Sequence, residues 1–474
     1  MDNYTMTKIV ATLGPASSTK EKIRELFHAG VTMFRLNSSH GDVEMHKQNL
    51  SYIREIEEEE KTLIPVLLDL QGPKIRIGNL PQSIEIHKGD ILKFRHQPEI
   101  TGDILPVDYK GMADDVTPGE KIMIDDGKLQ LEVKKVEDRV IFAEVLTDGL
   151  LKQRKGINIP GSQGSLDVLT ERDLKFVEFA AHADIDYLGL SFVREASDIV
   201  KLRDLLHKHG NYTARIISKI EKPQAVNNID AIIEVSDGIM VARGDMGVEI
   251  PMEEVPIIQK RIIKLTTAAG KNVITATQML DSMMKHPRPT RAEATDVANA
   301  IYDGTTGIML SGETANGDYP LEAVQTMVRI AERAEKDIDY VGRLQKTGAR
   351  LPQEQDTTTS ICHATCTVAT DLNAAAIIPV SMSGFTSGMV ARFKPNCPII
   401  ACTTSRLVWR QMNLQWGVTP LLIAEENTAE DLFREAVKAA ENAGLIKKGD
   451  KVVLTAGMPL GIPGRTNMLR VVEV

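Results

Sequence analysis

The sequence predicts an α/β protein: a (β/α)8 TIM barrel, with a small β-barrel lid domain inserted in it and an open α/β domain after it. Two observations predict the barrel. Short β-branched apolar runs recur eight times in the first 340 residues, and longer amphipathic stretches alternate with them. A third observation predicts the additions: about 100 residues of different character separate the third run from the fourth, far more than one loop needs.

The eight runs are mostly apolar at their centres, as expected of parallel strands buried on both faces. They span residues 8–13, 32–36, 64–70, 187–192, 215–220, 238–242, 272–277 and 307–311. Helical periodicity between them predicts helices at 18–29, 42–60, 170–183, 195–209, 253–269 and 291–302. The barrel is therefore assigned to residues 1–71 and 167–342.

The insertion has the period of two that is typical of strands, as in SIEIHKGDILKFR and KIMIDDGKLQLEVKKVEDRVIFAEVL. Asp126-Gly127 is a hairpin signal between two such stretches. We therefore expect residues 72–166 to form a separate β domain. Because it follows the third strand, it lies on the catalytic face and is placed to act as a lid.

After the polar segment GRLQKTGARLPQEQDTTTS, the αβ alternation resumes. Strands are expected at 375–380, 398–402, 417–421 and 451–456, with a helix at 428–443. Residues 343–474 are therefore assigned to a third domain with an open sheet.

Composition excludes several classes of protein. The chain has 474 residues with 56 Lys and Arg against 65 Asp and Glu, a net charge of −9, which argues against nucleic acid or an anionic membrane as the main partner. No apolar stretch approaches the roughly 18 residues that span a bilayer. The polar start MDNYTMTKIV is unlike a secretory signal, so a cytoplasmic location is expected.

Four cysteines lie in the last quarter of the chain: Cys362, Cys366, Cys397 and Cys402. Their apolar contexts favour reduced, half-buried thiols of a cytosolic protein. A zinc site with these spacings is the alternative.

Polar and charged groups follow six of the eight runs. Because parallel strands end at one rim of a barrel, we expect them to converge there. They occur in Arg35-Leu-Asn37-Ser-Ser39-His40, Asp69-Leu70-Gln-Gly-Pro-Lys74-Ile-Arg76, Lys219-Ile-Glu221, Ala242-Arg243-Gly244-Asp245, Thr277-Gln278 and Ser311-Gly-Glu313.

This mixture of groups points to phosphate and a divalent metal. Arg35, Arg76, Arg243 and Lys219 supply cationic donors. Glu221 and Asp245 follow adjacent strands, and two carboxylates with water are how Mg²⁺ is usually held. Backbone N–H groups at Gly244 are placed to face an anion. Together these are the parts of a phosphoryl-transfer site.

Each group also has a structural explanation of its own. Lys219 could pair with Glu221, Asp245 could cap a helix, and Arg76 could be a solvated charge; Thr277 and Ser311 could be caps, and the loop from Arg35 to His40 an ordinary turn. A functional site is favoured because all six groups fall on one rim.

The chain resembles the pyruvate kinase family along its whole length. The resemblance is carried, in order, by TKIVATLGPAS, FRLNSSHG, LLDLQGPKIRIG, RKGINIPG, IISKIEKPQAV, VARGDMGVEIP, TQMLDSMMKHPRPTRAE and MLSGETANGDYP. It implies phosphoryl transfer from phosphoenolpyruvate to ADP, giving pyruvate and ATP in the last step of glycolysis. It also implies that Mg²⁺ or Mn²⁺ is the cofactor and that the protein is a homotetramer. Allosteric regulation by an effector is implied as well.

The resemblance also implies residue roles. Lys219 and Arg35 would meet the transferring phosphoryl group, and Glu221 and Asp245 would ligate the metal. The substrate-binding set would be Arg35, Lys219, Ala242, Arg243, Gly244, Asp245 and Thr277, and the catalytic set adds Ser311, which with Thr277 would relay the proton to the enolate. Arg76, Lys155, Asn37 and His40 would contact the nucleotide.

One departure concerns K⁺. The family builds a K⁺ site from the positions of Asn37, Ser39, Asp69 and Leu70, and many members have Glu where this chain has Lys74. An internal ammonium can replace the cation's charge, so K⁺ is not expected to be required. If Lys74 instead points to solvent, the requirement remains.

A second binding site is expected in the C-terminal domain. Ser381, Ser383, Gly384, Phe385 and Thr386 lie between a strand and a helix and resemble the family's effector loop. A sugar phosphate or a nucleotide is the expected effector, with Arg434 as a candidate partner for a second phosphate. An ordinary turn rich in capping residues is the alternative.

Two alternative functions are open at this point. One is a phosphoenolpyruvate-handling lyase or aldolase on the same barrel, which would form no ATP. The other is a catalytically silent phosphometabolite-binding protein, which would lack part of the lysine and metal set.

Overall fold

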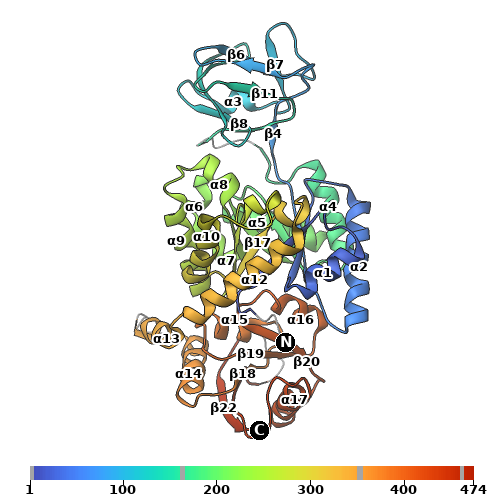
Figure 1. Ribbon diagram of the computed structural model, residues 1–474, viewed down its shortest axis with the longest axis vertical. Helices are drawn as coiled ribbons and strands as arrows, with labels where there is room; N and C mark the ends of the chain where they lie inside the picture. Colours follow the sequence, from blue (N-terminus) through green and yellow to red (C-terminus); the bar gives the residue numbers. More distant parts are fainter. Residues whose placement is uncertain (1–4, 161–165, 350–355, 427, 460–463) are drawn as a thin grey trace.

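The computed structural model describes residues 5–160, 166–349, 356–426, 428–459 and 464–474. Parts of three predicted segments lie outside these residues: the polar N-terminus (1–4), the end of the inserted domain (161–165) and part of the polar boundary (350–355). Figure 1 shows a β-rich part at the top, a barrel in the middle and an α/β part at the bottom.

A closed barrel of parallel strands forms the middle of the molecule. Within the described residues, eight strands close in the order β1-β17-β16-β15-β14-β13-β3-β2. They are β1 (Lys8–Leu13), β2 (Met33–Asn37), β3 (Val66–Asp69), β13 (Tyr187–Leu190), β14 (Arg215–Ile220), β15 (Gly238–Ala242), β16 (Asn272–Ala276) and β17 (Gly307–Leu310). The predicted barrel is confirmed, with strand bounds shifted by at most two residues.

Helices surround the barrel and bury their apolar faces against it. They are α1 (Lys20–His28), α2 (Val43–Glu60), α4 (Glu171–His182), α5 (Ala196–Lys208), α6 (Pro223–Asn227), α7 (Ile229–Val235), α8 (Arg243–Glu249), α9 (Val255–Ala268), α10 (Arg291–Asp303), α11 (Gly312–Ala315) and α12 (Pro320–Asp337), with a 3-10 turn at Asp281–Met284. Capping boxes at Thr170 and Thr290 set where α4 and α10 begin, as short polar side chains do when they bind the first free N–H groups.

The inserted β part leaves the barrel after β3. Its elements are β4 (Ile75–Arg76), β5 (Ile84–Ile86), β6 (Ile91–His96), β7 (Ile104–Val107), α3 (Met112–Asp115), β8 (Lys121–Ile124), β9 (Leu129–Glu137), β10 (Val140–Val145), β11 (Gly149–Leu151) and β12 (Gly156–Asn158). The hairpin predicted at Asp126-Gly127 joins the antiparallel pair β8 and β9, and both residues have positive φ. This part has its own apolar core and stands over the end of the barrel where β3 finishes.

The C-terminal part is an α/β layer structure. It contains α13 (Tyr340–Ala349), α14 (Thr357–Asp371), β18 (Ala376–Pro379), α15 (Phe385–Ala391), β19 (Ile399–Thr403), α16 (Arg406–Met412), β20 (Val418–Leu422), α17 (Ala429–Asn442), β21 (Lys451–Ala456) and β22 (Met468–Glu473). The sheet order is β20-β19-β18-β21-β22. The sequence did not predict β22, an antiparallel edge strand whose residues are partly buried or exposed, which gives a weak apolar signal.

The C-terminal part closes the lower end of the barrel. Leu414 belongs to the apolar cluster inside the barrel, with residues such as Val10 and Met240. Arg410 pairs with the buried Asp186 at 2.7 Å, and the Tyr187 hydroxyl donates to the Gln411 carbonyl at 2.6 Å. Buried apolar and ionic contacts therefore join the two parts.

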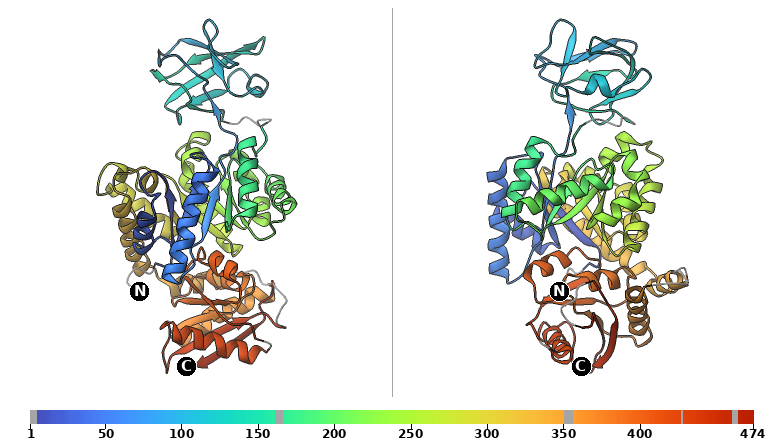
Figure 2. Two further views of the ribbon diagram at one scale, coloured as in Figure 1. Left: turned by 90° about the vertical axis from the view of Figure 1, so that its right-hand side faces the viewer. Right: turned by 180° about the vertical axis from the view of Figure 1, so that it is seen from behind.

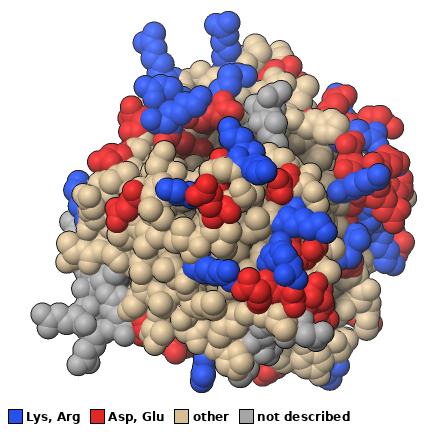
Figure 3. All heavy atoms as spheres, turned by 90° about the horizontal axis from the view of Figure 1, so that it is seen from below, with Lys and Arg blue, Asp and Glu red and all other residues tan. Residues whose placement is uncertain are grey.

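The surface carries charges of both signs. On the face seen from below in Figure 3, Lys and Arg side chains are interspersed with Asp and Glu. This mixture is unlike the one-signed surface of a nucleic-acid-binding protein. Among the described residues, no helix has the length and apolar character to cross a bilayer.

Candidate active site and second cavity

Strands β2, β3 and β14 place a buried ionic cluster at the rim of the barrel, where β2 adjoins β3 and β13 lies between β3 and β14. Arg35 of β2 binds Asp69 of β3 through Nε at 2.8 Å and Nη2 at 2.6 Å, and its Nη1 donates to the Thr12 hydroxyl at 3.0 Å. Lys219 of β14 lies with its Nζ 3.4 Å from the other oxygen of Asp69. Asp69 therefore holds two predicted catalytic cations side by side.

Lys219 is held as an ammonium. Its Nζ donates to the Ser191 hydroxyl at 2.6 Å and lies 3.0 Å from Glu221 Oε1. Burial lowers the pKa of Lys219, but the Asp69 and Glu221 carboxylates raise it by more, so the net shift is upward. Its side chain is only 11% exposed, so this charge acts in a medium with little water.

Glu221 and Asp245 have the chemistry of a divalent-metal site. Glu221 Oε2 accepts from the Phe192 N–H at 2.8 Å, whereas Oε1 is buried with the Lys219 ammonium 3.0 Å away. Burial raises the pKa of Glu221 to about 7; Lys219 lowers it, and Asp245 raises it further. A bound divalent cation would relieve the repulsion between these two carboxylates. Two carboxylates completed by water are the oxygen ligands that Mg²⁺ prefers, because it keeps several waters in its octahedral shell.

The loop after β16 and the start of α8 are tied together. The Thr277 hydroxyl accepts from the Gly244 N–H at 2.7 Å and donates to the Ala276 carbonyl at 2.6 Å. Thr277 and Gln278 have φ of 71° and 53°, in the left-handed region that non-glycine residues rarely adopt. Ala242 stands at the N-cap of α8, and Asp245 lies in its first turn.

Ser311 follows β17 with a buried hydroxyl that has no hydrogen-bond partner among the described residues. Its N–H donates to Glu313 at 2.8 Å, and the other oxygen of Glu313 accepts from the Leu280 N–H at 3.0 Å. Glu313 thus joins the loops after β16 and β17, and the free Ser311 hydroxyl is left to bind water or substrate.

The loop after β2 carries Asn37, Ser39 and His40. The Asn37 side chain accepts from the Ser39 N–H at 3.1 Å, and the His40 carbonyl contacts His46 Nε2 at 3.0 Å. Arg172 of α4 donates to the Ser38 carbonyl at 2.9 Å and to the Gly41 carbonyl. His40 is exposed at the tip of this fixed loop.

The inserted part carries Arg76 and Lys155. They lie beside one another because β4 pairs with β12, and Lys155 Nζ is 2.7 Å from Asp125 Oδ1. Lys74, before β4, lies with Nζ 3.9 Å from Asp245 Oδ1 and is 26% exposed. Leu70 donates its N–H to the Gly189 carbonyl at 2.9 Å.

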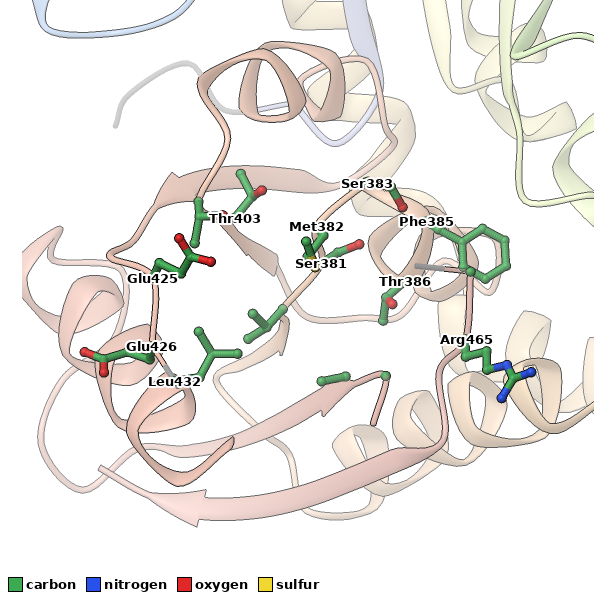
Figure 4. Close-up of a pocket in the computed structure, with 15 residues that line it drawn as sticks. Ser381, Met382, Ser383, Phe385, Thr386, Thr403, Glu425, Glu426, Leu432 and Arg465 are labelled. Atoms are coloured by element: carbon green, nitrogen blue, oxygen red, sulfur yellow. The ribbon is translucent and has the colours of Figure 1, made fainter. Parts of the chain in front are cut away.

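A cavity of about 130 Å³ opens in the C-terminal part beside the predicted effector loop. Ser381, Ser383, Phe385 and Thr386 line it, and Gly384, with φ of 75°, turns the chain into α15. Figure 4 shows Phe385 and Arg465 at one end, and Glu425 and Glu426 at the other. Arg434 pairs with Asp431 on α17 and is not among the lining residues.

Several of these residues were missed by sequence reasoning. Ser191 directly follows β13, and the strand-end signal that identified its neighbours applies to it equally. No local signal marks Glu425, Glu426 or Arg465, because only the folded sheet brings them to one cavity.

Comparison with known families identifies the fold and its catalytic class. The family model described as "Pyruvate kinase, barrel domain" matches residues 4–324, and the one described as "Pyruvate kinase, alpha/beta domain" matches residues 359–472. The chain belongs to the pyruvate kinase family. Membership makes it a phosphotransferase that requires a divalent metal.

Individual relatives agree with this assignment. A pyruvate kinase of Clostridium acetobutylicum is 44% identical, covering 98% of both chains. One of Geobacillus stearothermophilus is 46% identical over 98% of this chain and 80% of its own length. A crystal structure of a pyruvate kinase from Cryptosporidium parvum superposes with a TM-score of 0.93 at 35% identity, covering 99% of this chain and 96% of that chain. The resemblance found in the sequence is confirmed, and these relatives favour the enzyme over the silent binding protein.

Proposed function

We propose that this chain transfers a phosphoryl group from phosphoenolpyruvate to ADP, releasing pyruvate and ATP. One observation carries the proposal beyond family membership: the buried cluster of Arg35, Asp69, Lys219 and Glu221 at the barrel rim, with Asp245 acting electrostatically on Glu221. It supplies fixed positive charge where phosphoryl oxygens become negative in the transition state.

Arg35 and Lys219 bind and orient the phosphoryl group. Three of the five N–H groups of Arg35 make hydrogen bonds within the described chain, which leaves two for the substrate. Lys219 contributes a charged donor that Asp69 and Ser191 hold in place. Arg76 and Lys155 approach the nucleotide phosphates from the lid, and Asn37 and His40 approach the nucleotide from the loop after β2.

Glu221 and Asp245 hold the divalent metal, which we propose is Mg²⁺ or Mn²⁺. When bound, the metal neutralises negative charge on the substrate oxygens. The chain's own contribution to the second half of the reaction is a proton path. The hydroxyls of Thr277 and Ser311 relay the proton that converts the enolate to pyruvate.

The reaction is tested by following pyruvate and ATP together, with phosphoenolpyruvate, ADP and Mg²⁺ as the only additions. Equal amounts of both products are expected. Pyruvate without ATP would favour the lyase or aldolase alternative. If neither product forms, the alternative of a catalytically silent binding protein is favoured.

We further propose that Lys74 replaces K⁺. Its ammonium lies 3.9 Å from Asp245 Oδ1, close to the proposed metal pair, whereas Asn37, Ser39, Asp69 and Leu70 occupy the family's cation positions. In a buffer with only tetramethylammonium, wild-type turnover should lie within about twofold of that with K⁺. Lys74→Glu should be activated by K⁺ about tenfold or more, which corresponds to about 1.4 kcal/mol.

The control is Lys128→Glu, since Lys128 is a lid lysine that is 71% exposed. It should respond to K⁺ as the wild type does. Strong activation of the wild type by K⁺ would contradict the role given to Lys74.

The cavity beside α15 is proposed as an effector site for a phosphomonoester, such as a sugar monophosphate or AMP. Hydroxyls of Ser381, Ser383 and Thr386 and the Arg465 side chain suit a single phosphate. Glu425 and Glu426 at the far end would repel a second phosphate and would accept hydrogen bonds from hydroxyl or amino groups.

Glucose 6-phosphate or AMP should therefore shift the phosphoenolpyruvate saturation curve, and fructose 1,6-bisphosphate should shift it less. The preference is the ratio of the bisphosphate concentration to the monophosphate concentration that produces half of the maximal shift. Replacing both Glu425 and Glu426 by Gln should reduce this ratio by about tenfold or more, because two negative charges facing the second phosphate are removed. A panel that leaves the curve unmoved would contradict the effector site. A stronger wild-type response to the bisphosphate would contradict the role of the two glutamates.

We also propose a cytoplasmic homotetramer. Exposed apolar side chains before α9, on α9 and on the edge strand β22 support self-association: Met252 is 72% exposed, Ile257 62% and Val471 43%. The outer side of β22 pairs with no other strand of the described chain, which leaves its backbone groups for a second copy.

A further inference from the structure

The guanidinium of Arg243 has an acceptor within the protein for each of its N–H groups. The side chain is 12% exposed, and a guanidinium has five N–H groups. Five acceptors surround it: Ala276 O at 3.4 Å from Nε, Asp296 Oδ1 at 2.7 Å and Gln259 Oε1 at 3.5 Å from Nη1, and Thr277 O and Met279 Sδ, both at 2.8 Å, from Nη2. Direct binding of a substrate by this side chain would require breaking one of these contacts.

The direction of the side chain supports the same conclusion. Arg243 lines an open groove on the outer helix layer, together with Gln259 of α9 and Asp296 of α10. These helices lie outside the barrel strands in Figure 1. Only the backbone at Arg243 belongs to the start of α8, where Gly244 and Asp245 follow.

The acceptors of Arg243 include two consecutive carbonyls of an unusual turn. Thr277 and Gln278 both have positive φ, a conformation that two non-glycine residues adopt only when surrounding contacts impose it. The guanidinium binds the carbonyls of Ala276 and Thr277, and Asp296 fixes the guanidinium from the other side. The same turn aims the Thr277 hydroxyl at the Gly244 N–H.

We infer that Arg243 is a positioning residue and not a substrate ligand. It holds the left-handed turn that places the Thr277 hydroxyl beside the start of α8, and Asp296 of α10 anchors it. This inference rests on the proposed function, in which Thr277 relays a proton to the enolate. The inference also makes Asp296, on the outer helix layer, a positioning residue, because it anchors the Arg243 guanidinium.

The test compares Arg243→Lys and Asp296→Ala with wild type. Both variants should lower kcat by about 10- to 100-fold, since misplacement of a catalytic group by about 1 Å costs this much, while KM for phosphoenolpyruvate changes less than about threefold. Both should also slow the exchange of pyruvate methyl hydrogens with deuterated water, which reports the proton step alone. In a Thr277→Ala background neither change should add more than about twofold.

Conservative and matched variants separate this role from general destabilisation. Asp296→Asn keeps an acceptor for the guanidinium and should recover most of the activity that Asp296→Ala loses. Arg203→Lys is the control, because Arg203 also bridges a carbonyl, Val235 O, and a carboxylate, Asp237, away from the site. It should leave kcat and exchange unchanged.

A crystal structure of Asp296→Ala gives a readout that does not depend on turnover. The inference expects Thr277 to leave the left-handed region or its hydroxyl to lose the Gly244 N–H. An unchanged turn would overturn it, as would a raised KM for Arg243→Lys with full activity for Asp296→Ala. An inactive wild type would overturn the proposed function instead, leaving the structural result on the turn to stand.

Discussion

Replacing Lys219 by methionine should lower kcat by about 10³-fold, the upper range for removal of one preorganised donor, while KM for phosphoenolpyruvate changes far less. The loss is expected in kcat because the ammonium meets charge that grows in the transition state. Methionine keeps the length and most of the apolar volume of the side chain. Steady-state kinetics in both substrates measures the two constants.

A structural loss must be separated from a catalytic one, because the substitution leaves Asp69 and Glu221 without their shared cation. The thermal unfolding midpoint of each variant monitors this. Lys201→Met is the matched control, since Lys201 pairs with Asp167 on the exposed surface. If the kcat of Lys219→Met lies within about tenfold of the wild-type value, the role proposed for the Lys219 ammonium is contradicted.

The sequence was sufficient to locate the ends of the barrel strands and the polar residues gathered there. Parallel strands of a barrel are continuous apolar runs, so the residue after each run is known to within one or two positions. Arg35, Asp69, Lys219 and Glu221 were found in this way, and Asp69, Arg35 and Lys219 do lie within hydrogen-bond or ion-pair distance.

The sequence could not predict the direction in which each side chain points. Asp69 was predicted only as a cation position, and its contacts with Arg35 and Lys219 depend on the strand order of the closed barrel, in which β2 adjoins β3 and β13 separates β3 from β14. Arg243 was predicted to bind substrate because it is a cation directly after the sixth predicted strand and because the family resemblance implies it. Its side chain turns outward to Asp296, 53 residues later in the chain, and no local pattern encodes such a pairing.

The second cavity shows the same limit. The hydroxyl-rich segment from Ser381 to Thr386 was visible as a motif, because it lies between a strand and a helix. Its far wall comes from residues after β20, and Arg465 precedes β22. Ligand preference depends on these distant residues, so the sequence alone left the effector open.

Replacing Glu221 by glutamine should weaken metal binding by at least about 100-fold, the upper end of the loss seen for outer-shell partners alone. Glutamine keeps the shape and the acceptor for the Phe192 N–H, but it removes one of the two charges that attract the ion. Mn²⁺ titration followed by electron paramagnetic resonance measures the affinity without turnover. Activity at fixed Mg²⁺ should fall in parallel and recover partly at high Mg²⁺.

Glu249→Gln is the matched control for this prediction. Glu249 is also a buried carboxylate near the rim, with one oxygen that lacks a hydrogen-bond partner in the described chain, but its other oxygen already accepts from Lys222 and Asn158, both at 2.9 Å. That variant should keep wild-type Mn²⁺ affinity, because Glu249 contacts Lys222 and Asn158 and is not a member of the proposed metal pair of Glu221 and Asp245. If the Mn²⁺ affinity is unchanged in Glu221→Gln and lost in Glu249→Gln, the proposed metal site is contradicted. The metal would then be assigned to Glu249, at the base of the lid.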